Sequence, residues 1–286
     1  MTNYRFMRFP GGRMSAFSLS YDDGVGTDLR LMDIMRKHGL KGTFNISSRF
    51  LSVPACDLDI EKNPTGRFSM RQIVKHYADF EVATHGATHP FYAELPTSAA
   101  VYDIVKDREV LERAFGRIVR GHAYPNGSYT AETVAAFRAA GILYARTTAR
   151  TGGFDLPEEP LLYGATAHHK DGNMDGIIDR FFAESRYAIK PRLFCVWGHS
   201  YEFETDNNWH VIEHIAERVG GHDEVWYAGL QEIFEYVAAY RSLVHSMDSN
   251  LVHNPTAKTV WISSDVHNKS VIAIAPGETV RLDTNG

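Results

Sequence analysis

Two adjacent carboxylates follow the first apolar segment of the chain, in the stretch SYDDG at residues 20–24. Because like charges repel, Asp22 and Asp23 are expected either to use a cation or to lie in a solvated turn or helix cap, which is the commoner case. His85 and His89 stand four residues apart in the stretch HGATH. One helical turn would bring both imidazoles to the same side, although two surface histidines would show the same spacing.

A carboxylate and two imidazoles form a three-ligand set of the kind that catalytic zinc sites use, with one position left open for water. Asp23, His85 and His89 are therefore the expected ligands of a divalent cation, with Zn²⁺ preferred and Co²⁺ or Ni²⁺ as alternatives. Such an ion lowers the pKa of its bound water and polarises a carbonyl oxygen. Asp22 is then free to act as the general base, and the cation offsets the repulsion between the two carboxylates.

Two further groups would complete a hydrolytic site. His199, in the stretch VWGHSYE, could protonate a leaving group, because imidazole titrates near neutral pH. The backbone N–H near Asn126, after Pro125 and beside Gly127, is a candidate donor to an oxyanion. Together these residues predict a metal-dependent hydrolase of amides or esters.

Strand-like and helix-like segments alternate along the chain, which predicts an α/β fold with a parallel sheet and helical crossovers. The expected strands are residues 16–21, 42–46, 80–84, 122–124, 142–147, 192–197 and 224–228. The expected helices are residues 28–39, 69–78, 97–115, 131–141, 174–188, 208–220 and 230–243. About seven such units suit a closed or nearly closed barrel. The carboxyl ends of its strands converge on one face, so the candidate residues between 22 and 199 are expected to meet in one pocket.

Residues 151–173 form a loop-rich insertion. The pattern of the sequence changes near residue 246, because the segments at 259–263, 270–275 and 279–283 alternate like short strands. We expect a barrel domain at residues 1–245 and a short β extension at 246–286 packed on it, because about 40 residues rarely bury a core alone. Self-association through the strand edges of this extension stays an open alternative.

Composition excludes several classes of protein. The chain has 286 residues, a formal net charge of −5 and no dense Lys/Arg run, which argues against nucleic acid as a partner. Its two cysteines give no disulfide framework: Cys195 lies in an apolar run and Cys56 in a distant loop. No segment has the length of a membrane span or the apolar core of a signal peptide. The chain as it stands is therefore expected to be cytoplasmic, although a trimmed secreted protein would look the same.

Four motifs occur in an order known from one family: SYDDG at 20–24, HGATH at 85–89, AYPNG at 123–127 and WGH at 197–199. They resemble those of the NodB-like polysaccharide deacetylases, the fourth carbohydrate esterase family, over about residues 13 to 240. The resemblance implies a distorted (β/α) barrel that removes acetyl groups, usually N-acetyl from glucosamine units and sometimes O-acetyl from xylan.

The same resemblance implies roles for individual residues. It makes Asp23, His85 and His89 the zinc ligands, Asp22 the general base and His199 the general acid. The implied partner is an acetylated oligosaccharide or polysaccharide. The residues expected on the substrate and oxyanion side of the pocket are Tyr124, Pro125, Asn126 and Trp197.

Three departures from the family pattern indicate a divergent branch. The arginine that steadies the base falls on Ala123, so Arg146 is the first candidate to replace it and Arg120 the second, a surface or ion-paired arginine being equally expected. Gly86 stands where a Ser or Thr often braces the metal loop. No clear Asp-Trp segment follows the fifth strand, where ARTTARTGGFD stands instead.

Other polar and aromatic residues have a more ordinary interpretation. His168 and His169 could line a substrate groove, but loop histidines are mostly solvent-exposed. Glu202 and Glu204 could orient His199, but a solvated loop is the default. Tyr201 and Trp209 could stack on a sugar, although packing at the rim is commoner. His210 and His214 are interpreted as surface residues rather than a second metal site.

Two rival functions stay open. One is hydrolysis of a non-sugar amide, such as a small cyclic ureide, at the same site. The other is a catalytically weak sugar-binding protein, which would follow if Arg146 did not reach Asp22.

Overall fold

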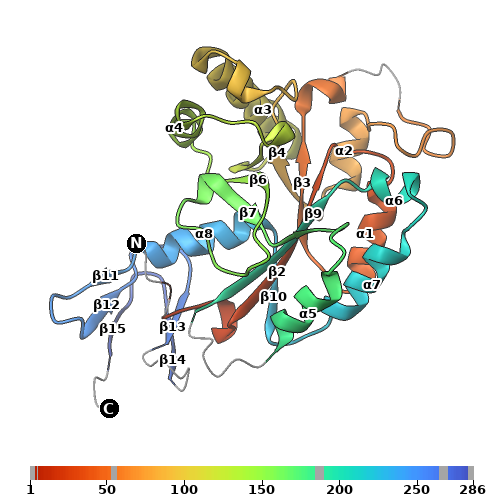
Figure 1. The fold of residues 1–286 in the computed structure, drawn as a ribbon. Coiled ribbons are helices and arrows are strands. Elements are labelled where there is room, and N and C mark those ends of the chain that lie inside the picture. The colour runs from red at the N-terminus through yellow and green to blue at the C-terminus, as the bar shows by residue number, and fades with distance from the viewer. Residues whose placement is uncertain (1–3, 5, 53–56, 184–189, 264–269, 283–286) are drawn as a thin grey trace.

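A parallel β-sheet forms the centre of the protein in the computed structural model, which describes residues 4, 6–52, 57–183, 190–263 and 270–282. Figure 1 shows its strands surrounded by helices. The sheet consists of β2 (Ser15–Asp22), β3 (Gly42–Ile46), β4 (Glu81–Thr84), β5 (Gly121–Ala123), β6 (Tyr144–Arg150), β7 (Tyr163–Ala165), β8 (Ala167–His168), β9 (Arg192–Gly198) and β10 (Val225–Tyr227). Every pairing within it is parallel.

The sheet closes on itself. Its order is β7-β6-β5-β4-β3-β2-β9-β8, and only Thr166 separates β7 from β8 along the chain. One short segment therefore pairs with β6 on one side and with β9 on the other, and the Thr166 N–H donates to the Cys195 carbonyl at 3.0 Å. The predicted α/β barrel is confirmed. The two strands that close it lie in the predicted loop-rich insertion, where they are too short to show a period of two.

The barrel is distorted around β2. Residues 15–21 of β2 pair with β9 along one edge. The other edge is shared, because residues 15–17 pair with β10 and residues 19–22 pair with β3. Strand β10 is thus wedged in at the amino end of the barrel only, and the carboxyl ends of β2 and β3 stay adjacent at the opposite face.

Helices cover the outside of the barrel. They are α1 (Asp28–Lys37), α2 (Met70–His76), α3 (Thr97–Phe115), α4 (Ala131–Ala139), α5 (Met174–Phe182), α6 (Tyr201–Thr205), α7 (His210–Val219) and α8 (Leu230–Arg241). Residues 184–189, at the end of the predicted helix 174–188, lie outside the described part.

Strand β2 shows how alternation separates the core from the site. Its outward side chains, Phe17, Leu19 and Tyr21, join one apolar cluster with Leu31 and Met35 of α1. Each fully buried apolar side chain of this size stabilises the fold by about 1.5–3 kcal/mol. Its alternate side chains, which include Ser20 and Asp22, are buried and polar and point into the barrel.

Two small antiparallel sheets complete the chain (Figure 1). One contains β1 (Met7–Arg8), β13 (Val260–Ser263) and β14 (Val271–Ile274), and the other β11 (Val244–His245), β12 (Leu251–His253) and β15 (Thr279–Arg281). Val252, Val260 and Ile274 pack with Ala239 of α8. The amino-terminal strand β1 thus pairs within the expected extension, and the division at residue 246 stays a prediction.

No described helix has the combination of length and apolar character that a membrane crossing requires. Cys195 is a buried free thiol, as its apolar surroundings predicted, whereas Cys56 lies outside the described residues.

Candidate active site

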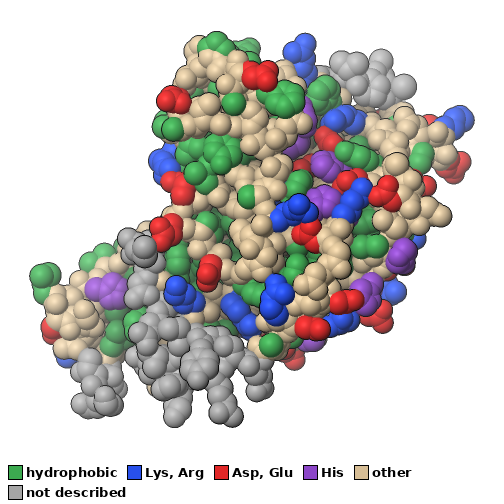
Figure 2. All heavy atoms as spheres, viewed as in Figure 1, with side chains coloured by type: hydrophobic (Ala, Val, Ile, Leu, Met, Phe, Trp, Pro, Cys, Tyr) green, Lys and Arg blue, Asp and Glu red, His purple; other side chains and the backbone are tan. Residues whose placement is uncertain are grey.

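The carboxyl ends of the barrel strands bring the candidate residues together. Asp22 ends β2, His85 follows β4, Arg146 lies in β6 and His199 follows β9. Figure 2 shows histidine, acidic and basic side chains gathered side by side on this face of the molecule. The predicted convergence of residues from distant parts of the sequence is therefore observed for these four.

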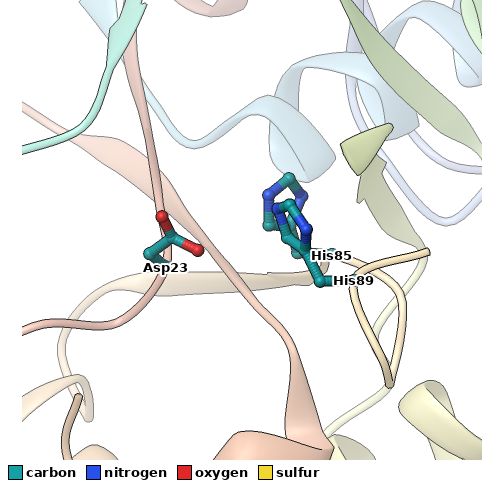
Figure 3. A group of neighbouring side chains, drawn as sticks. All are labelled: Asp23, His85 and His89. Atoms are coloured by element: carbon teal, nitrogen blue, oxygen red, sulfur yellow. The ribbon is translucent and has the colours of Figure 1, made fainter. Parts of the chain in front are cut away.

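Asp23, His85 and His89 form a compact group of possible metal ligands. Their ligand atoms all lie within 4.8 Å of one another, and Figure 3 shows the Asp23 carboxylate facing the two imidazole rings. The rings of His85 and His89 are 4.8 Å apart. Asp23 and His89 both have a left-handed backbone, with φ of 86° and 52°, which turns their side chains toward the common point. Such strain in non-glycine residues is typical of functional sites.

The protonation of His85 fits metal binding. Its Nδ1 lies 2.8 Å from the carbonyl oxygen of Ala123, an atom that can only accept a hydrogen bond. Nδ1 therefore carries the proton and Nε2 keeps its lone pair. Burial lowers the pKa of His85, which keeps the ring neutral as a ligand requires. The donor set of one carboxylate and two neutral imidazoles suits Zn²⁺ and its neighbours in the transition series.

Two aspartates of α3 hold the loop between the histidines. Asp103 accepts hydrogen bonds from the N–H groups of Ala87 and Thr88 at 2.9 and 3.1 Å and from the Thr88 hydroxyl at 2.8 Å. Asp107 accepts the His85 N–H at 3.0 Å. These residues were not predicted, because the loop-facing side of α3 cannot be recognised from sequence spacing.

The conformation of this loop requires a glycine at position 86. Its φ is 68°, and a Cβ there would lie 2.7 Å from Pro90 Cδ and 2.8 Å from the Tyr92 hydroxyl. Pro90 and Tyr92 thus leave no room for a side chain at residue 86, and Asp103 holds the loop instead.

Asp22 is buried and held by two groups, the guanidinium of Arg146 and the amide of Asn45. Nη2 of Arg146 lies 2.6 Å from each of its oxygens, and the Asn45 amide donates to Oδ1 at 2.8 Å. Burial raises the pKa of Asp22, but the charge of Arg146 above all, together with that of His199, outweighs this effect and holds the pKa well below its usual value. Asp22 is therefore ionised at neutral pH, with Oδ2 facing His85 and His199 at 4.0 and 3.8 Å.

Arg146 reaches Asp22 from the centre of the barrel. Its Nε donates to the Ser20 hydroxyl at 3.0 Å, and its guanidinium lies 4.5 Å from the Trp197 ring centre. Arg120, the second candidate, instead donates to the Gly141 carbonyl at 3.1 Å. Of the two arginines considered, Arg146 is the one that contacts the carboxylate.

The carboxylate of Glu202 contacts three imidazole rings and an ammonium group. Its Oε2 lies 3.3 Å from His199 Nδ1, His168 Nε2 and His169 Nε2, and its Oε1 lies 3.0 Å from Lys170 Nζ. The expectation of a solvated Glu202 and solvent-exposed histidines is wrong, because the side chain of His169 is fully buried and those of His168 and Glu202 are only 12% and 18% exposed. The contact of Glu202 with His199 was considered from the sequence as an alternative, whereas its contacts with His168, His169 and Lys170 were not.

The contact with Glu202 fixes the orientation of His199. A proton on Nδ1 directed at the carboxylate leaves Nε2 toward Asp22, the side on which a substrate would lie. Burial lowers the pKa of His199, but the Glu202 hydrogen bond and the charges of Asp22 and Asp23 outweigh it and raise the pKa above 6.5.

His168, His169 and Glu202 also lie close enough together to hold a metal. Their hydrogen bonds argue against this. The Lys170 N–H donates to Nδ1 of His168 at 3.1 Å, so the proton of that ring is on Nε2, the atom facing Glu202. The Lys170 ammonium already neutralises the carboxylate. Burial lowers the pKa of His169 to about 3. Glu202, held by His168 and Lys170, therefore supports His199 instead.

The remaining predicted pocket residues lie less directly in the site. The Tyr124 ring is buried and stacks on Phe137 at 5.7 Å, while its N–H donates to the Arg146 carbonyl at 2.9 Å. Pro125 begins the turn Pro125–Gly127, in which Asn126 has a φ of 56°. Trp197 is buried under Arg146 rather than open to a ligand.

Four of the less certain residues lie around or outside the site. The Tyr201 ring is half-buried and lies 5.1 Å from that of His199. Trp209 instead donates to Glu204 at 2.8 Å. His214 is exposed and contacts Asp175 at 2.8 Å, as expected of a surface residue.

Residues 9–145 match the model of the polysaccharide deacetylase family. This match ends before β9, so His199 and Glu202 lie outside it. No curated protein sequence matches the chain.

The fold is similar to that of a protein from Mycobacterium smegmatis described as a polysaccharide deacetylase. The TM-score is 0.59 at 17% identity, over 84% of this chain and 96% of that one. A family 4 carbohydrate esterase from Streptomyces lividans in complex with acetate has a TM-score of 0.48 at 18% identity, over 75% and 92% of the two chains. A pseudoenzyme of the same family from Bacillus anthracis has a TM-score of 0.47 at 19% identity, over 80% and 68%. At 17–19% identity, the first of these likenesses bears on the fold alone and the other two carry no argument.

Proposed function

We propose that this chain, whose residues 9–145 belong to the polysaccharide deacetylase family, is a metal-dependent hydrolase that removes acetyl groups from an acetylated carbohydrate. The observation that carries the proposal is the ionised carboxylate of Asp22, paired with Arg146 at 2.6 Å, directly beside the ligand group of Asp23, His85 and His89. The reacting bond is the N-acetyl amide of a glucosamine unit or the O-acetyl ester of a xylan-type sugar.

Asp23, His85 and His89 would hold the metal, for which we propose Zn²⁺, with Co²⁺ or Ni²⁺ as alternatives. When bound, such an ion polarises the acetyl carbonyl and makes water a nucleophile at neutral pH. Asp22 accepts the proton of that water at Oδ2, the oxygen that faces the two histidines. Arg146 keeps Asp22 charged and fixes its orientation, so the base is ready before substrate binds.

His199 donates its proton from Nε2 to the departing amine or alcohol. Glu202 holds the opposite ring nitrogen at 3.3 Å, which keeps the ring from turning and favours the charged form. The backbone N–H of Asn126 is the proposed additional donor to the developing oxyanion. The Tyr201 ring, 5.1 Å from that of His199, is the proposed contact for a sugar ring.

Arg146 also bears on the rival function of sugar binding without turnover. That function rested on a base left without its arginine, and the contact with Asp22 removes this reason. Hydrolysis of a non-sugar amide uses the same residues and is separated from our proposal by the choice of substrate.

Acetate release tests the proposal. Protein stripped with a chelator and reloaded with Zn²⁺ is given N-acetylglucosamine oligomers, acetylated xylan and a cyclic ureide. We expect release from an acetylated carbohydrate that requires metal and falls at least about 100-fold in Asp22→Asn. Zinc-loaded protein that releases no acetate from any carbohydrate would contradict the proposal, and opening of the ureide would favour the rival.

A further inference from the structure

Arg67 occupies a fixed position beside the candidate metal ligands. Its backbone forms an antiparallel bridge with Val25, and the next N–H, of Phe68, donates to the Gly24 carbonyl at 3.1 Å. Residues 66–68 are thereby attached to the turn that follows Asp23. The side chain of Arg67 starts from rigid backbone rather than from a free loop.

The guanidinium group of Arg67 contacts Asp23 itself. Its Nη1 donates to the Asp23 carbonyl at 3.1 Å, and its Nη2 lies 2.9 Å from Oδ1 of the carboxylate. It also lies 4.6 Å from the ring centre of Phe50, which limits its movement. The side chain is 34% exposed, whereas that of Asp23 is 9% exposed, so Arg67 forms the solvent side of this pair.

The charges of the site explain why Arg67 matters once metal is bound. In the protein alone, the carboxylates of Asp22 and Asp23 are balanced by the guanidinium groups of Arg146 and Arg67. A divalent ion then adds two positive charges that these residues do not compensate. The proton that water gives to Asp22 stays within the site and leaves this excess unchanged, so the loaded site favours a ligand that brings a negative charge.

We infer that Arg67 selects substrates that carry a carboxylate close to the acetyl group. This inference rests on the proposed function and specifies its substrate class as an acidic acetylated carbohydrate. Arg67 is suited to this because a guanidinium presents several N–H donors in one plane, which matches the two oxygens of a carboxylate. The carboxylate must lie near the acetyl group because Arg67 contacts a ligand of the metal.

Direct binding provides the test. The probes are N-acetylmuramic acid, whose lactyl carboxylate is next to the acetamido group, and its uncharged methyl ester. Calorimetry with zinc-loaded Asp22→Asn protein measures their affinity without turnover. We expect the acid to bind at least about tenfold more tightly than the ester. Adding Arg67→Gln should remove this difference, and Arg67→Lys should restore only part of it because lysine lacks the planar fork.

Arg71→Gln provides the matched control, because Arg71 lies on the same segment, is 81% exposed and pairs with Asp57. It should leave both affinities unchanged. Zinc affinity, measured with a competing dye, shows whether Arg67 only steadies Asp23: in that case Arg67→Gln would weaken metal binding and affect acid and ester alike. Equal affinity for the two probes, a difference that persists without Arg67, or binding of neither probe would overturn the inference.

The outcome is separable from that of the proposed function. An Arg67-dependent preference for the acid in a protein that releases no acetate would remove the hydrolase and keep the anion site. Acetate release without any preference for the acid would keep the hydrolase and remove the anion site.

Discussion

At the scale of single residues, the site depends on pairs that keep a side chain in one charge state. Asp22 is buried, and a lone carboxylate there would take up a proton. Arg146 prevents this through contacts of 2.6 Å with both oxygens. Because both members are buried, removal of either leaves an uncompensated charge, which typically costs about 3–5 kcal/mol.

Replacement of Arg146 should therefore affect both rate and stability. We expect Arg146→Gln to lower acetate release at least about 100-fold, with Arg146→Lys intermediate, because lysine keeps the charge but not the planar geometry. Arg120→Gln is the control, since Arg120 contacts the Gly141 carbonyl instead. The midpoint of thermal unfolding should be lower than that of wild type for Arg146→Gln and unchanged for Arg120→Gln. Equal activity of the two glutamine variants would contradict the role of Arg146.

Glu202 should set the pH range of the reaction through His199. Its hydrogen bond raises the pKa of His199, and a general acid works only while it is protonated. Glu202→Gln should lower this pKa, so the decline of kcat with rising pH should begin at lower pH. Glu204→Gln, which affects a carboxylate bonded to Trp209, should leave the profile unchanged. Superimposable profiles of kcat against pH for wild type and Glu202→Gln would rule out that Glu202 sets the pH range through His199.

At the scale of elements, helix α3 determines the shape of the metal-ligand loop. Asp103 replaces the missing loop side chain by accepting two backbone N–H groups and two hydroxyls, those of Thr88 and Tyr92. The loop is therefore held from the helix and not from within. A change on α3 should reach the metal through this contact.

Asp103→Asn tests this connection. The amide can accept with only one oxygen, so buried donors lose their partner, which should cost about 1–3 kcal/mol of stability. The looser histidine loop should bind Zn²⁺ about 10- to 100-fold more weakly, as for other changes next to metal ligands. Glu109→Gln on the exposed side of the same helix is the control. Unchanged zinc affinity in Asp103→Asn would show that the loop keeps its shape without the helix.

At the scale of the whole molecule, buried carboxyls join elements that are distant in sequence. Asp28 at the start of α1 accepts hydrogen bonds from Tyr77, which follows α2, and from Ser200, which follows β9. Burial raises the pKa of Asp28 from 3.8 to about 7. The contacts of Asp28 with Tyr77 and Ser200 therefore stabilise the fold most when Asp28 is protonated.

This raised pKa predicts the direction in which stability depends on pH. Between about pH 4 and 7 the folded protein binds the Asp28 proton more tightly than the unfolded chain. The contribution of Asp28 to stability is greatest below this window and should fall by about 1.4 kcal/mol per pH unit within it. In urea unfolding of protein stripped of metal with a chelator, the free energy of unfolding should fall less steeply with pH in Asp28→Asn than in wild type. The exposed control Asp33→Asn should show the same slope as wild type. A slope equal to that of wild type in Asp28→Asn would contradict this.

The sequence by itself determined the class of fold and which residues form the candidate metal-ligand group. The alternation of apolar periods is a local property, and it predicts parallel strands whose carboxyl ends share one face. Asp22, Asp23, His85 and His89 were recognisable because each pair is close in sequence and follows a strand. The match over residues 9–145 agrees with the family that these motifs indicated.

The tertiary structure decided which distant side chains meet. Arg146 reaches Asp22 across 124 residues of sequence, and His168, His169 and Lys170 reach Glu202 only because β8 closes the barrel beside β9. The direction of a side chain inside a closed barrel depends on strand register and tilt, which no local pattern encodes. For the same reason the ligand loop was predicted but its support by Asp103 was not.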